Sequence, residues 1–81
     1  MDPSEVAAII EAGIEGSQVT VTADGSKYTA VVVADAFEGL TMIKEQKMVY
    51  ALLNEHITSG AIHALTIKAY TPQEFAALED A

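Results

Sequence analysis

The chain has 81 residues, enough for one small domain over residues 1–81. It contains no cysteine, which excludes a disulfide framework or a zinc finger, so folding must rest on apolar packing. Twelve acidic residues against four lysines and no arginine give a net charge of −8, which disfavours binding to a phosphate backbone. No apolar run reaches the length of a membrane span and no basic leader opens the chain, so we expect a cytoplasmic protein.

The first predicted helix begins in Asp2-Pro3-Ser4-Glu5. Asp2 is an expected N-cap, Pro3 suits the first helical position, and Glu5 completes an arrangement like a capping box. Apolar residues then recur at helical spacing and give this helix one buried face up to Gly16. The members of that face are Val6, Ile9, Ile10, Gly13 and Ile14.

Two strands joined by a tight turn follow. Residues 18–22 alternate between polar and apolar side chains, residues 28–34 form a β-branched run, and Asp24-Gly25 is a strong hairpin signal between them. Phe37-Glu38-Gly39 then predicts a bend. We expect an antiparallel hairpin that ends at this bend.

A longer helix is predicted next, with Thr41 as its N-cap and Thr58-Ser59-Gly60 at its end. His56 lies near that end, where a cation interacts favourably with the helix dipole. Its predicted buried stripe consists of Ile43, Val49, Tyr50, Leu53 and Ile57.

The last strand, residues 62–70, carries one histidine among apolar residues. Alternation predicts that His63 shares a face with Leu65, Ile67 and Ala69. Such an imidazole is a satisfied core group, a proton-exchanging group, or a soft-metal ligand exposed at the end of a sheet.

A short final helix is predicted from Thr71-Pro72-Gln73-Glu74, with Phe75 and Leu78 as its packing face. The element order is therefore α-β-β-α-β-α. Because the third strand follows a helical crossover, we expect an α+β fold with a mixed three-stranded sheet covered by helices on one side.

No pair of carboxylates and no Ser-His-Asp arrangement indicates catalysis, so we do not expect an enzyme. Lys44 and Lys47 lie three residues apart on the long helix. They are consistent with a solvated face, with a surface that docks a partner protein, or with a local nucleic-acid patch.

The chain resembles the BolA family over essentially its whole length, and within it the short bacterial branch of the IbaG/YrbA type. The segments that carry the resemblance are Phe37-x-Gly39, Lys44-x-Gln46-Lys47-x-Val49-Tyr50 and Ile62-His63-Ala64-Leu65-x-Ile67-x-Ala69-Tyr70-Thr71-Pro72.

This resemblance implies a fold similar to the type II KH domain and a partnership with monothiol glutaredoxins in iron–sulfur cluster trafficking or iron homeostasis. The implied cofactor is a 2Fe–2S cluster shared with glutaredoxin and glutathione, with none in the isolated chain. His63 matches the family's most constant ligand, and Lys44, Gln46 and Lys47 are the expected partner-binding residues. We expect the isolated protein to be monomeric or weakly dimeric.

The first hairpin departs from the family pattern. Lys27 stands where relatives of this branch can carry a histidine, and a protonated lysine has no lone pair to offer a metal. His63 is then the main ligand from this chain, with Asp24 as a weak second one. This departure keeps open a purely regulatory partner that docks on glutaredoxin without a cluster.

The alternative function is a KH-like nucleic-acid binder or transcriptional regulator. KH domains grip nucleic acid with a G-x-x-G loop, and Gly39-Leu40-Thr41-Met42 lacks the second glycine. Nucleic-acid binding is therefore the less favoured prediction.

Overall fold

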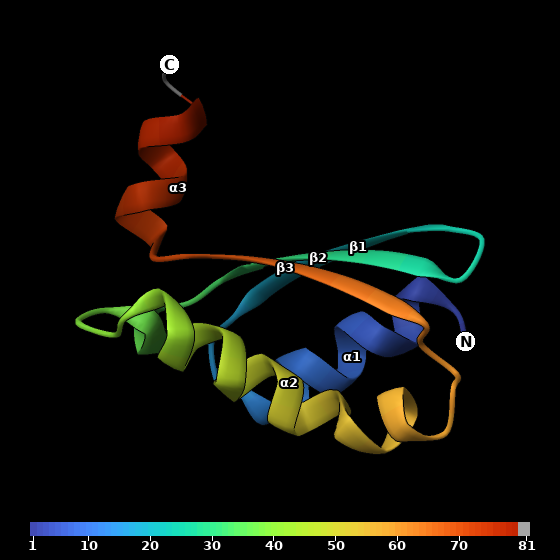
Figure 1. Cartoon of the computed structure of the whole chain (residues 1–81). Helices are drawn as coiled ribbons and strands as arrows, with labels where there is room; N and C mark the ends of the chain where they lie inside the picture. The colour runs from blue at the N-terminus through green and yellow to red at the C-terminus, as the bar shows by residue number, and fades with distance from the viewer. Residues whose placement is uncertain (80–81) are drawn as a thin grey trace.

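The computed structural model describes residues 1–79 and has the predicted element order (Figure 1). Its elements are α1 (Pro3–Gly13), β1 (Gln18–Asp24), β2 (Lys27–Val33), the 3-10 helix η1 (Asp35–Phe37), α2 (Met42–Thr58), β3 (Ala64–Tyr70) and α3 (Pro72–Glu79). The predicted bend at Phe37-Glu38-Gly39 is η1 together with the turn that follows it. Within residues 1–79, no helix is long and apolar enough to cross a membrane.

The three strands form one mixed sheet in the order β1-β2-β3. β1 and β2 are antiparallel, and β2 and β3 are parallel, which confirms the predicted topology. Asp24 pairs with Lys27, so the hairpin loop consists of Gly25 and Ser26 alone. Gly25 has a φ of 64° and Ser26 does not have a positive φ, the pattern of a type II′ turn, which favours glycine at its first central position.

α1 and α2 lie beneath one face of the sheet, while α3 extends from the end of β3 (Figure 1). The core lies between the sheet and the first two helices. It is built from Val6, Ile10, Ile14, Tyr28, Ala30, Val32, Ala34, Phe37, Val49, Leu53, Ile62 and Ile67. The expectation of helices on one side is therefore confirmed for α1 and α2.

Two of the three predicted side-chain caps are present. The Thr41 hydroxyl accepts a hydrogen bond from the Lys44 amide at 3.3 Å. Thr71 and Glu74 form a complete capping box, with bonds of 2.8 and 3.2 Å. Asp2 is the N-cap of α1, but its side chain forms no capping bond, and its backbone carbonyl accepts from Glu5 at 3.0 Å instead.

The predicted packing faces of α2 and α3 were partly wrong. Ile43 and Tyr50 are exposed, because the stripe of α2 that faces the sheet contains Val49 and Leu53. At 100° per residue, Ile43 lies about 120° round the helix from Val49. Leu78 is also exposed, because α3 leaves the sheet instead of lying on it.

Candidate functional site

His63 lies at a bend immediately before β3, and its side chain is exposed. β3 begins only at Ala64, so His63 precedes the regular alternation of the strand. Its exposure excludes the satisfied core group and is consistent with both a proton-exchanging group and a soft-metal ligand at the end of the sheet.

The backbone on both sides of His63 is fixed. The buried Ile62 donates its amide to the His56 carbonyl at 3.1 Å, which ties the bend to the last turns of α2. On the other side, the Ala64 amide donates to the Ser26 carbonyl at 3.4 Å. The exposed imidazole is thus carried on a short segment that is anchored at both ends.

The hairpin loop lies beside this segment. Ala64 is the register partner of Lys27, and Lys27 is the partner of Asp24, so the three residues form one row across the sheet. Neighbouring strands lie about 4.8 Å apart, which places the Asp24 backbone about 10 Å from that of Ala64. Extended by one residue, the same parallel register sets Ser26 opposite His63, and Lys27 is the next position along β2.

Within residues 1–79, no group of three or more His, Cys, Asp and Glu side chains is placed to hold a metal ion. Of the donors predicted from the sequence, Asp24 ends β1 and His63 precedes β3, so they lie at the same end of the sheet with β2 between them. A metal centre at His63 would need further ligands from a second molecule.

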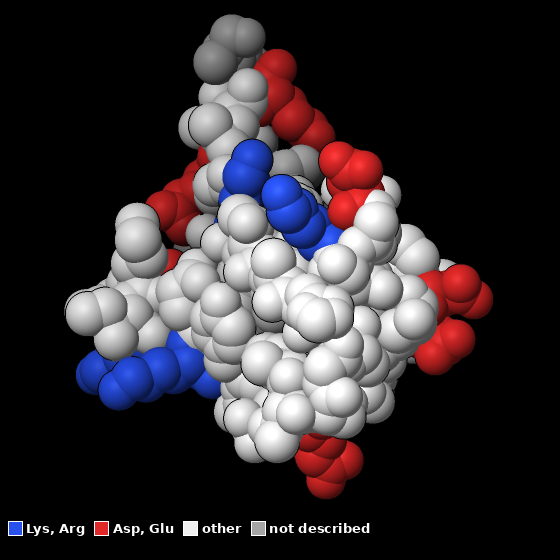
Figure 2. All heavy atoms as spheres, turned by 45° about the vertical axis from the view of Figure 1, so that its right-hand side comes forward, with Lys and Arg blue, Asp and Glu red and all other residues white. Residues whose placement is uncertain are grey.

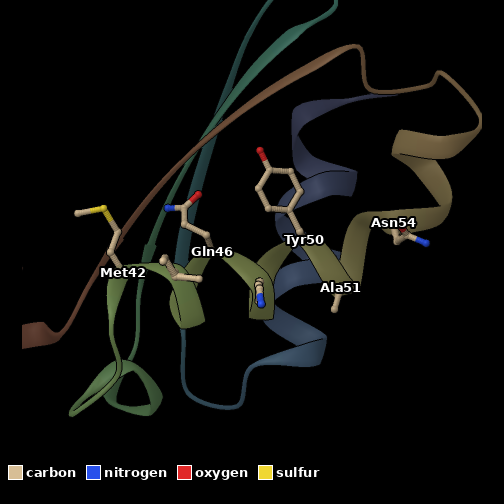
Figure 3. A pocket seen from close by; sticks show the side chains of 7 residues that line it. Met42, Gln46, Tyr50, Ala51 and Asn54 are labelled. Carbon is tan, nitrogen blue, oxygen red and sulfur yellow. The ribbon is translucent and has the colours of Figure 1, made fainter.

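α2 runs along the free edge of β3, and two of its side chains cap this edge. Gln46 Nε2 donates to the Ile67 carbonyl at 2.9 Å, and the Tyr50 hydroxyl donates to the Leu65 carbonyl at 3.1 Å. Figure 3 shows both side chains pointing from α2 toward β3. Gln46 and Tyr50 are four residues apart on α2, a rise of about 6 Å, and their partners Ile67 and Leu65 are two residues apart on β3, about 6.6 Å. The two side chains are therefore spaced to reach two carbonyls of the same strand edge. These bonds protect an otherwise open strand edge.

An apolar groove lies along the outer side of α2 (Figure 3). Met42 and Ile43 are 75% and 69% exposed in this region, which is high for such large apolar side chains. The groove has a volume of about 480 Å³. It is lined by Met42, Ile43, Gln46, Lys47, Tyr50, Ala51 and Asn54.

The predicted partner-binding residues lie in or beside this α2 groove. Lys47 lines it, and Lys44 is exposed on the same helix. Gln46 also lines it, but its amide is already bound to the β3 edge. Ile43 and Tyr50 were missed as surface residues. The signal was present, since the apolar residues of α2 spread too far round the helix to share one buried face.

The direction of α2 relative to β3 follows from its two edge bonds. Gln46 lies beside Ile67 and Tyr50 beside Leu65, so α2 proceeds toward the start of β3, which His63 immediately precedes. His63 is not among the residues that line the groove. Figure 2 shows a broad uncharged face, with acidic groups around its rim and lysines in two separate places. The chain thus combines an apolar groove on α2, lysines in or beside it and an exposed imidazole at the end of the sheet.

Comparisons with known proteins identify the family of this chain. The sequence matches the family of BolA-like proteins over residues 7–74. It is 37% identical to the acid stress protein IbaG of Escherichia coli K12 over 76 residues, covering 94% of this chain and 90% of that protein.

Two solved structures are similar to this chain. A bolA protein homologue from Coxiella burnetii has a TM-score of 0.83 and 36% identity, covering 94% of this chain and 97% of that one. The BolA domain of SufE1 from Arabidopsis thaliana has a TM-score of 0.77 and 28% identity, covering 89% and 93%. The chain therefore belongs to the BolA family, in the branch of IbaG.

Proposed function

We propose that this protein is a non-enzymatic adaptor that docks on a monothiol glutaredoxin and contributes His63 to a 2Fe–2S cluster shared with glutaredoxin and glutathione. The observation that carries the proposal is an exposed imidazole on an anchored segment immediately before β3, in a chain without cysteine. Family membership supports the same conclusion.

The donor chemistry supports a shared rather than a private cluster. Iron–sulfur clusters are held by thiolates, which this chain lacks, and histidine replaces thiolate in some clusters. An imidazole ligand leaves the cluster less negatively charged and raises its reduction potential. His63 fits this role, whereas the Lys27 ammonium does not. The thiolates would come from the glutaredoxin and from glutathione.

Docking of the glutaredoxin on the α2 groove would bury Met42 and Ile43, the most exposed large apolar side chains within residues 1–79. An apolar centre with a polar rim is the usual anatomy of a protein interface, and Lys44 and Lys47 supply the rim on this side. Both lysines would favour an acidic partner surface.

The test is a titration of this protein into a cluster-loaded monothiol glutaredoxin homodimer, followed by visible absorption and circular dichroism. We expect a saturable spectral change at one-to-one stoichiometry. His63→Ala should remove or alter this change, while His56→Ala, the matched control, should leave it intact. An unchanged spectrum and cluster lifetime with His63→Ala would refute the ligand role.

Two other results would point elsewhere. A complex on size exclusion without a spectral change would support the purely regulatory partnership. Absence of any complex would turn attention to nucleic acid, for which a low-salt titration with mixed DNA and RNA is the direct test. The lysines give that alternative little support, because Lys44 and Lys47 lie on α2 and Lys27 and Lys68 lie on strands.

A further inference from the structure

A second hollow lies between the first turns of α2 and the last part of β3. Met42, Glu45 and Gln46 line it on the helix side, and residues 67–70 line it on the strand side. Its volume is about 210 Å³. Pockets for drug-sized ligands measure about 300–1,000 Å³, so this hollow suits a single side chain.

Glu45 is the notable residue of this hollow. Only 9% of it is exposed, yet its carboxylate forms no hydrogen bond or ion pair within residues 1–79. Burial raises the pKa of Glu45, and the nearby charge of Glu74 raises it further. The carboxylate oxygens still reach solvent, and a cation that entered the hollow would offset both the partial desolvation of Glu45 and the nearby charge of Glu74.

The adjoining edge of β3 has a free backbone position. The Ala64 amide and the Tyr70 carbonyl bond toward β2 and its flanking residues, so the backbone N–H and C=O groups of the even-numbered residues of β3 point toward β2. The backbone groups of the odd-numbered residues therefore point away from β2, toward the free edge. Leu65 and Ile67 have their carbonyls capped by α2. Ala69 is left uncapped by the side chains of the described residues 1–79.

We propose that this edge and hollow bind an extended segment of a partner protein, whose backbone pairs with Ala69 and whose Lys or Arg side chain enters the hollow to pair with Glu45. An added strand would lie about 4.8 Å from β3, directly over the opening. An arginine suits the site better than a lysine, because its guanidinium binds a carboxylate through two parallel bonds.

The other charges around the hollow agree with a cationic guest. Glu74 contributes a second negative charge from α3. Lys68 is the cation of the hollow's lining, but strand alternation places its side chain on the face opposite Ile67 and Ala69. Tyr70 completes that end as a neutral group.

This site is separate from the proposed cluster site. Ala69 is six residues from His63, or about 20 Å along the strand, so the hollow does not include the proposed cluster ligand. The hollow adjoins the α2 groove and shares Met42 and Gln46 with it. The two proposals are tested with different ligands and different readouts, so they can fail independently.

The probe is a fluorescein-labelled peptide, Thr-Val-Arg-Val-Thr, with a matched peptide that carries norleucine in place of arginine. Fluorescence anisotropy should show at least tenfold tighter binding of the arginine peptide. Amide shifts in a ¹⁵N correlation spectrum should centre on residues 67–70. Equal binding of the two peptides, or shifts centred elsewhere, would overturn the proposal.

Two variants of this chain sharpen the test. Glu45→Gln should weaken arginine-peptide binding at least tenfold, while Glu11→Gln, which neutralises an exposed acid of α1, should not. Ala69→Pro removes the outward amide without removing a bond to β2, and it should abolish binding while the thermal unfolding transition persists. Full affinity in either Glu45→Gln or a folded Ala69→Pro protein would contradict the proposed contacts.

Discussion

Removal of the two side chains that cap the β3 edge should destabilise the protein unequally. Gln46→Met keeps the length of the side chain but leaves the Ile67 carbonyl, on a residue only 8% exposed, without its donor at 2.9 Å. An unsatisfied buried group costs about 1–3 kcal/mol. Tyr50→Phe removes an exposed bond of 3.1 Å, and water can replace the hydroxyl there. We expect a loss of about 0.5 kcal/mol or less for Tyr50→Phe.

Urea unfolding monitored by circular dichroism measures the difference. With a slope of about 1 kcal/mol/M for a small domain, Gln46→Met should lower the unfolding midpoint by about 1–3 M and Tyr50→Phe by at most about 0.5 M. Lys47→Gln, on the same helix but without a bond to β3, should leave the midpoint unchanged. Equal losses for the two edge variants, or a larger loss for Tyr50→Phe, would refute the assignment of the buried bond to Gln46.

Further predictions concern Glu45 and the hairpin. Burial raises the pKa of Glu45 in the folded state above its value in the unfolded chain. Protonated Glu45 therefore contributes to the free energy of unfolding, fully below the unfolded-state pKa, and this contribution is lost as the pH rises through the folded-state pKa. Glu45→Gln mimics the protonated acid and should therefore raise the unfolding free energy at pH 8 but not at pH 4; a pH series of urea melts checks this, and an equal gain at both pH values would contradict it. Lys27→His places a second imidazole beside the segment that carries His63, so we expect a longer lifetime of the mixed cluster in absorption decay, with Thr29→His on the same strand as control. No difference between the two histidine variants would argue against a ligand position at residue 27.

The helix caps and the hairpin turn could be predicted from the sequence, because each is specified by residues close together in the chain. Thr41 and Thr71 cap helices through bonds that span three residues, and Gly25 supplies the backbone conformation that its own turn requires. Strand alternation and the crossover helix then left one reasonable sheet. His63 stood out as a histidine in an apolar strand, and the family resemblance favoured the ligand among its possible roles. The caps and the turn depend on contacts within a few residues, so the order of residues along the chain is enough to predict them.

The candidate surfaces depended on the tertiary structure. Sequence periodicity placed Ile43 and Tyr50 in the core and said nothing of the burial of Glu45. Which residues of α2 are buried depends on the rotation of the helix about its own axis relative to β3. This rotation is fixed by contacts such as that between Gln46 and Ile67, 21 residues apart. His63 was likewise assigned to a strand face, because its exposure depends on the bend tied to His56 and Ser26. A helix can turn about its axis without any change in local propensity, so only packing against distant residues decides which side is buried and which remains free to bind.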